Sequence, residues 1–128
     1  MRDLNPDGWP RPRGYSNGIE AEGRLVFVAG MIGWDSQGRF ADGLVAQFEQ
    51  VLRNTVAVLA EANAGPEHVV RMTWYVKDLD AYRDNLRGMG AAYRDVMGRN
   101  FPTMAVVGVS DLVEPEALLE IETTAVVP

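Results

Sequence analysis

The chain has 128 residues, 47% of them hydrophobic and 23% charged, which is typical of a folded globular protein rather than a disordered or fibrous one. A net charge of −6 at pH 7 repels phosphate backbones and disfavours nucleic-acid binding. Without cysteine there is no disulfide or thiolate nucleophile, and one histidine leaves little for a metal site, although a magnesium site made only of carboxylates stays open.

The N-terminal third predicts an extended arm followed by a β-hairpin. Residues 1–14 contain three prolines and two glycines, a composition that favours extended chain over helix. We expect strands over 18–21 and 24–31, joined by a turn at Glu22 and Gly23. The second strand is apolar on both faces and therefore needs cover on both sides.

The middle of the chain predicts helix, strand and helix. Apolar residues recur at helical spacing over 44–62, and Gly65-Pro66 ends that pattern. Residues 69–77 alternate with period two, as in a strand with one drier face. A second helical stripe runs over 82–97 and contains Gly88 and Gly90, where a neighbouring element or a ligand can approach closely.

Two more strands are expected over 104–109 and 118–127. The resulting order, β-β-α-β-α-β-β, predicts one α+β domain over 1–128 in which two helices cover one face of a mixed sheet. Because two helices cannot cover the second face as well, we expect the protein to associate with itself. No apolar run reaches the roughly 20 residues that span a bilayer, and the first residues lack the apolar core of a signal peptide, so we expect a cytoplasmic protein.

Several motifs together resemble the RidA (YjgF) family of reactive-intermediate deaminases over most of the chain. The matching segments are G-Y-S-N-G at 14–18, V-F-V-A-G at 26–30, Q-F-E-Q-V-L-R-N at 47–54, the strand at 69–79 and E-I-E at 120–122. The resemblance implies a chorismate-mutase-like fold that assembles as a barrel-like homotrimer. It also implies ligand clefts between subunits and hydrolysis of imines or enamines.

The family's deaminases carry a Pro-Ala-Arg signature whose arginine grips the substrate carboxylate, and this chain departs from it. The corresponding segment is Pro102-Thr103-Met104, so the arginine position holds a thioether without charge or donor. An asparagine that the family often places in the second helix falls on Gly90. Both departures concern the same cleft and predict a substrate other than ordinary α-imino acids.

The resemblance assigns a catalytic role to Glu120 and Tyr15. A carboxylate at Glu120 can position and deprotonate water, although it can equally lie on a solvated face or pair with an arginine across a subunit interface. Glu122 projects from the same face and is expected to be structural. Tyr15 matches the tyrosine that closes the family's cleft from a neighbouring subunit, or it is a packing residue at the end of the arm.

Gly30, Met31, Met104 and Gly90 are expected to bind substrate. A glycine that ends a strand also suits a turn or bulge, and Met104 also suits simple core filling. As replacements for the missing cation the sequence offers Arg11, Arg13 or Arg71, and its spacing selects none of them.

The sequence therefore predicts a homotrimeric imine or enamine deaminase that needs no cofactor, with an unsaturated enamine of the aminomuconate type as one candidate substrate. The alternative is a non-catalytic trimer that binds or senses a small ligand. A ribonuclease role, attached to the family by older naming, is disfavoured by the negative charge.

Overall fold

The computed structural model describes residues 1–128 as a sheet, a two-stranded ribbon and a helical layer. The elements in chain order are β1 (Arg2–Leu4), β2 (Gly18–Glu20), β3 (Arg24–Met31), α1 (Leu44–Glu61), the 3₁₀ turn η1 (Pro66–His68), β4 (Val69–Val76), α2 (Leu79–Asp84), α3 (Leu86–Met97), β5 (Thr103–Gly108) and β6 (Leu119–Val127). The predicted α+β order is confirmed, with one short strand added at the start and the second helix divided.

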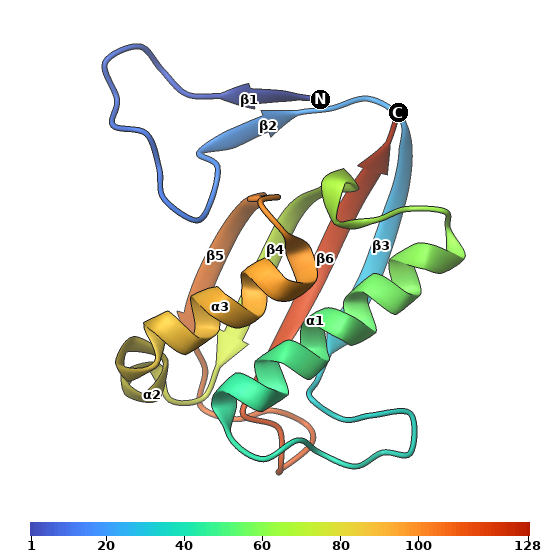
Figure 1. The fold of residues 1–128 in the computed structure, drawn as a ribbon, viewed down its shortest axis with the longest axis vertical. Coiled ribbons are helices and arrows are strands. Elements are labelled where there is room, and N and C mark those ends of the chain that lie inside the picture. The colour runs from blue at the N-terminus through green and yellow to red at the C-terminus, as the bar shows by residue number, and fades with distance from the viewer.

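The main sheet has four strands in the order β3-β6-β4-β5. β6 runs antiparallel to both of its neighbours, whereas β4 and β5 are parallel. The long helices α1 and α3 contact each other and lie on one side of this sheet (Figure 1). β3 and β5 form its two edges, each with one side free of a strand partner.

The core lies between the helices and the sheet. Phe48, Leu52 and Leu59 of α1 are fully buried against the inward residues of the central strands, among them Met72 and Ile121. Burial of each such side chain contributes roughly 2 kcal/mol, so this layer supplies most of the hydrophobic stabilisation. None of the helices is both long and apolar enough to cross a bilayer.

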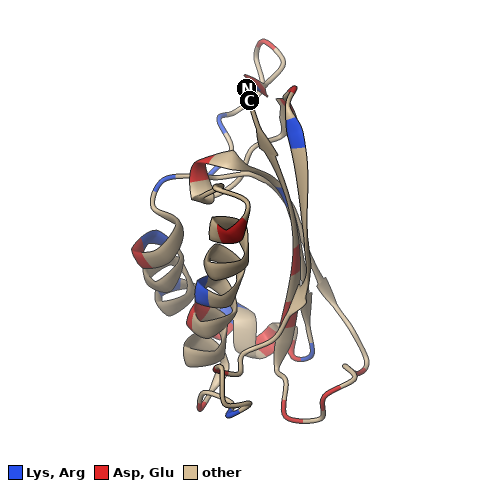
Figure 2. Ribbon diagram, turned by 90° about the vertical axis from the view of Figure 1, so that its right-hand side faces the viewer, with Lys and Arg blue, Asp and Glu red and all other residues tan.

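The other side of the sheet carries no helix, as Figure 2 shows from the edge. Leu25 and Phe27 of β3 are 63% and 71% exposed there. Arg71 and Glu122 lie on the same side. We call this surface the open face, and it confirms the prediction that the helices cover only one side of the sheet.

The predicted hairpin between 18–21 and 24–31 is wrong in its pairing. β2 pairs with β1, with Arg2 opposite Glu20, and the two side chains form an ion pair at 2.8 Å. A hydrogen bond from the Asn17 amide to Asn5 Oδ1, at 2.7 Å, also joins the two segments. The proline-rich arm turns back on itself, so its first residues occupy the place expected for β3, while β3 pairs with β6 alone.

The predicted second helix is interrupted at Asn85, between α2 and α3. The Asn85 side chain donates a hydrogen bond to the carbonyl of Ala81 at 2.7 Å. Asparagine side chains compete in this way with the helical hydrogen bonds of the backbone.

Gln47 in α1 ties together the two loops at the far end of the sheet. Its side chain is 3% exposed. The amide nitrogen donates to the carbonyls of Ala41 and Glu116 at 3.2 and 3.1 Å, and the amide oxygen accepts from the N–H of Leu118 at 2.9 Å. Because Leu118 directly precedes β6, this one side chain fixes where that strand begins.

We expect Gln47→Met to lower the free energy of unfolding by about 2–4 kcal/mol, because it leaves three partly buried backbone groups without partners. Urea denaturation measures the change, with the exposed Gln37→Met as the control that keeps wild-type stability. Equal midpoints for the two variants would contradict this role.

Candidate functional site

The six residues singled out from the sequence fall into two groups in the folded chain. Tyr15, Gly90 and Met104 line one cavity, and the remaining three line another. The two cavities use different edges of the sheet, since the first includes β5 and the second includes β3.

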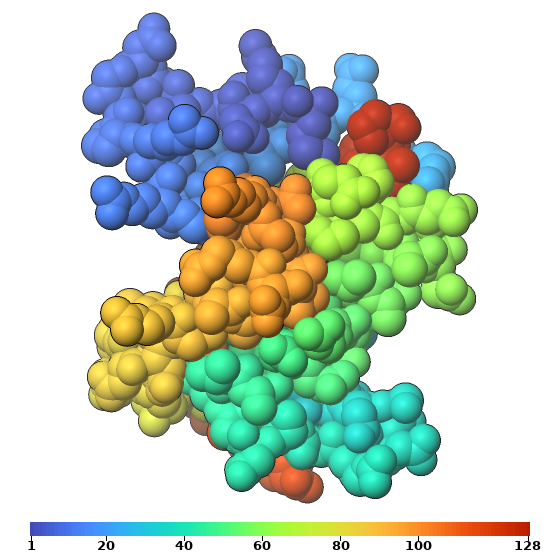
Figure 3. All heavy atoms as spheres, viewed as in Figure 1, coloured from blue at the N-terminus to red at the C-terminus, as the bar shows by residue number.

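The first cavity, which we call the α3 cleft, lies between α3, β5 and the end of the N-terminal arm and has a volume of about 510 Å³. In Figure 3 the surface is hollowed between the arm, in blue, and α3, in orange and yellow. Its lining residues are Arg13, Gly14, Tyr15, Trp74, Tyr82, Leu86, Met89, Gly90, Tyr93, Arg94, Phe101, Met104 and Val106. The cleft is thus mostly apolar and aromatic, with two arginines and no carboxylate.

Aromatic side chains form a continuous wall of the α3 cleft. Trp74 packs against Tyr82 and Tyr93, with ring centroids 6.3 Å apart in each case, and Tyr93 stacks on Phe101 at 5.8 Å. The Tyr93 hydroxyl donates to the carbonyl of Asn100, and burial raises the pKa of Tyr93 well above its usual value. The wall is therefore neutral and fixed in position. Trp74 is a core residue that also lines this cleft.

The arm holds Tyr15 at the mouth of the cleft. The next residue, Ser16, donates its N–H to the carbonyl of Pro102 at 3.0 Å and its hydroxyl to the carbonyl of Phe101 at 2.5 Å. Tyr15 itself stays 42% exposed. Its phenol is thus placed at the opening, where it can meet a ligand, rather than packed into the core.

Met104 lies opposite Met72 in the parallel pairing of β5 with β4 and is partly buried on the helix-facing side. Of the three arginines that the sequence offers as replacement cations, only Arg13 lines the α3 cleft. Arg11 lies in a shallow pocket of the arm, and Arg71 lies on the open face.

Arg94 is the cleft residue that sequence reasoning missed. It lies one helical turn after Gly90 in α3, and its Nη1 comes within 3.3 Å of the position that a Cβ on residue 90 would take. The i, i+4 spacing of the two residues would have placed them on one helix face.

The second cavity, which we call the Glu120 pocket, has a volume of about 220 Å³. It is lined by Gly30, Met31, Ile32, Trp34, Leu112, Val113, Glu114 and Glu120. A β-bulge between Val28 and Met31 shifts the pairing of β3 with β6. At Gly30 a Cβ would lie 2.3 Å from the Glu120 carboxylate, so only glycine lets that carboxylate rest on the β3 backbone.

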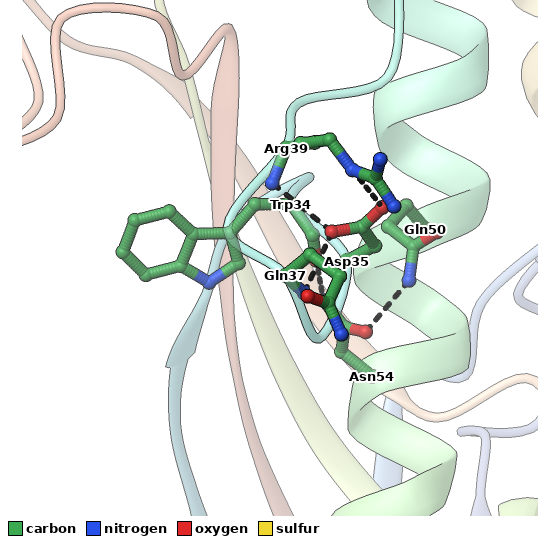
Figure 4. Close-up of polar contacts among 6 residues, drawn as sticks. All are labelled: Trp34, Asp35, Gln37, Arg39, Gln50 and Asn54. Atoms are coloured by element: carbon green, nitrogen blue, oxygen red, sulfur yellow. Dashed lines mark hydrogen bonds and ion pairs between the residues drawn. The ribbon is translucent and has the colours of Figure 1, made fainter.

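Asn54 of α1 anchors the segment that leads from the Glu120 pocket into the next loop (Figure 4). Its amide donates to the carbonyls of Ile32 and Trp34 at 3.1 and 2.8 Å, and its oxygen accepts from Gln50 at 2.8 Å. Asp35 accepts from two backbone N–H groups in the same loop, which lowers the pKa of its carboxyl. Gln50 and Asn54, which belong to the Q-F-E-Q-V-L-R-N motif of α1, thus have a structural role. They hold the backbone of Trp34 at the rim of the Glu120 pocket.

Glu122 has a structural contact on the open face, outside the Glu120 pocket. The Tyr75 hydroxyl on the adjacent strand donates to Glu122 Oε1 at 2.7 Å, and this hydrogen bond raises the pKa of Tyr75. No three acidic or histidine side chains converge in the way that a metal site requires.

Comparisons with known proteins agree with this architecture. A family model described as Endoribonuclease L-PSP matches residues 10–127. A RutC family protein of Aquifex aeolicus is 32% identical, with 98% of this chain and 99% of the relative covered. The crystal structure of YyfB of the Rid family, from Yersinia pestis, is 35% identical with a TM-score of 0.86 over 98% of each chain. Rv2704 from Mycobacterium tuberculosis, of the YjgF/YER057c/UK114 family, is 33% identical with a TM-score of 0.69 over 90% of this chain and 88% of its own. The chain belongs to the RidA/YjgF/UK114 family.

We expect Gly30→Ala to displace the Glu120 carboxylate while changing the free energy of unfolding by less than about 1 kcal/mol, because the clash falls on the end of a flexible side chain. A crystal structure of the variant and a denaturation curve measure the two effects. In the Glu120→Ala background, Gly30→Ala should leave the free energy of unfolding unchanged. If the Glu120 carboxylate kept its position in Gly30→Ala, the contact between residues 30 and 120 would be contradicted.

Proposed function

We propose that the protein is a homotrimer that hydrolyses a reactive imine or enamine in clefts between subunits, each cleft formed by the α3 cleft of one subunit and the Glu120 pocket of the next. The observation that carries this proposal is the separation of the two cavities. The polar groups suited to the chemistry lie around Glu120, while the larger ligand-sized cavity lies at the other edge of the sheet. A second copy of the chain can bring the two together.

The chemistry requires one group that handles protons beside the imine carbon. The Glu120 carboxylate takes a proton from water as the water oxygen bonds to that carbon, and the carboxylic acid so formed gives this proton to the imine nitrogen. The resulting amino alcohol loses ammonia as its C–N bond breaks and a carbonyl forms. An enamine is first protonated on carbon to give the imine. The Tyr15 hydroxyl provides a second polar contact to substrate or water.

The open face supports self-association. Leu25 and Phe27 expose large apolar surfaces there, and both sheet edges are free to meet another copy. A contact between unlike edges is head-to-tail, and such contacts close into a ring when the rotation between subunits fits. Three copies would join each β5 edge to a neighbour's β3 edge.

The lining of the α3 cleft favours a substrate unlike the usual α-imino acids. Met104 offers no charge or donor where the family's arginine would bind a carboxylate, and the neighbouring wall is aromatic. The conjugated chain of an aminomuconate-type enamine suits the aromatic wall, and its carboxylates would require the two cations that the lining offers, Arg13 and Arg94.

A non-catalytic binding trimer is the second candidate, and the thioether at Met104 is the observation that favours it. Methionine in place of the strand arginine removes the ion pair with the substrate carboxylate that the family resemblance implies, while leaving a ligand-sized cavity of about 510 Å³. Endoribonuclease activity, in contrast, is opposed by the net charge of −6.

The first test is ammonia release from 2-aminomuconate and from enzymatically generated α-imino acids. We expect release from aminomuconate, reduced about 100-fold or more in Glu120→Gln. Glu122→Gln is the matched control on the same strand and should keep the wild-type rate, since glutamine can still accept the Tyr75 hydrogen bond. No release from any substrate, with wild type and Glu120→Gln alike, would favour the binding trimer.

The second test is the oligomeric state, measured by light scattering after size-exclusion chromatography. A trimer of the 14.1 kDa chain has a mass of about 42 kDa. We expect Phe27→Glu to shift the mass towards the monomer, because it places a charge on the open face. Val58→Glu, at an exposed apolar position of α1, should leave the trimer intact. A monomeric wild type would overturn the shared cleft.

A further inference from the structure

We infer that Arg94, admitted by Gly90, is the carboxylate-binding residue of the α3 cleft, and that the ligand is a flat aromatic or conjugated carboxylate. The inference deepens the proposed function, since the same cavity would hold the substrate. It also explains why two departures from the family pattern, at residues 104 and 90, occur in one cleft.

The charge of the α3 cleft is opposite to that of the whole chain. The protein has 18 acidic and 12 basic residues, yet the cleft is lined by Arg13 and Arg94 and by no aspartate or glutamate. Neither arginine takes part in any ion pair of the structure. Two unpaired guanidinium groups beside a low-dielectric wall attract an anion.

Arg94 is the better placed of the two for recognition. It projects from the last turn of α3, whereas Arg13 belongs to the proline-rich arm; both arginines are exposed, but only Arg94 lies on a helix. Its Nη1 lies 3.3 Å from the place of a Cβ on residue 90. A Cβ at residue 90 would already stand in tight contact with the guanidinium, and the longer side chain of asparagine would compete with it for the space in the cleft.

The other residues that line the α3 cleft favour a ligand with a flat apolar part. Trp74, Tyr93 and Phe101 present ring surfaces, and Met104 adds a polarisable thioether beside them. The indole N–H of Trp74 is buried and is one of only two buried side-chain polar groups without a hydrogen-bond partner. A planar apolar group with one carboxylate suits such walls and the two cations.

Benzoate is the probe for carboxylate binding, and benzamide, which has the same ring but no charge, is its control. Titrating the oligomer with each compound and following ¹H–¹⁵N NMR spectra gives the two dissociation constants. We expect benzoate to bind, with a shift of the Trp74 indole resonance, and benzamide to bind about tenfold or more weakly. Arg94→Gln should weaken benzoate about 10- to 100-fold and leave benzamide unchanged. Arg87→Gln, on the same helix but outside the cleft, is the control and should bind like wild type.

Gly90→Asn provides a second and independent variant, because it leaves Arg94 in the chain but takes its space. We expect Gly90→Asn to weaken benzoate binding. In the Arg94→Gln background, we expect the further substitution Met104→Arg to restore benzoate binding, because it places a cation on β5. Unchanged benzoate affinity in Arg94→Gln, or equal affinity for benzoate and benzamide, would overturn the inference.

Glu120→Gln separates this inference from the proposed hydrolysis. It should abolish ammonia release while leaving benzoate affinity intact. If wild type releases no ammonia but binds benzoate through Arg94, the hydrolysis fails and the inference stands. If ammonia is released at the same rate by wild type and Arg94→Gln, the inference fails and the hydrolysis stands.

Discussion

The packing of two helices on only one side of a four-stranded sheet sets the conditions for everything else in this molecule. Phe48 and Leu52 of α1 are fully buried on that side, while Phe27 of β3 is 71% exposed on the other. The hydrophobic effect favours covering such a face, and in the proposed assembly the covering subunit would also lie against the sheet edges. The arrangement of the candidate site follows from this, because its two halves lie along those edges.

In the α3 cleft, a cation can reach the cavity from more than one element of the fold. Under our proposal, Met104 takes the place of the cation that the family resemblance puts on β5, and Gly90 leaves space for Arg94 one helical turn away. Arginine carries a long side chain with a planar fork of donors, so the same chemistry can enter a cavity from a helix instead of a strand. Under the proposed role of Arg94, the cleft therefore keeps a cation although the motif position on β5 holds Met104.

The sequence predicted the element order, the helical stripe of α1 and the alternation of β4 because each depends on local periodicity. It missed the pairing of β2 with β1 because pairing is a long-range choice that local composition does not encode, and it missed the interruption at Asn85 because one side-chain hydrogen bond decided it. It identified Gly30 and Glu120 separately. Their contact depends on the bulge in β3, which no spacing rule reveals.

The placement of the α3 cleft and the Glu120 pocket at opposite edges has a consequence for how the protein would behave on dilution. A site that lies within one chain exists as soon as that chain folds, whatever its concentration. A site shared by two chains exists only in the associated fraction, so its activity per chain falls by mass action as copies separate. For such a protein, expression level would act as a control on specific activity, with no effector and no change of fold.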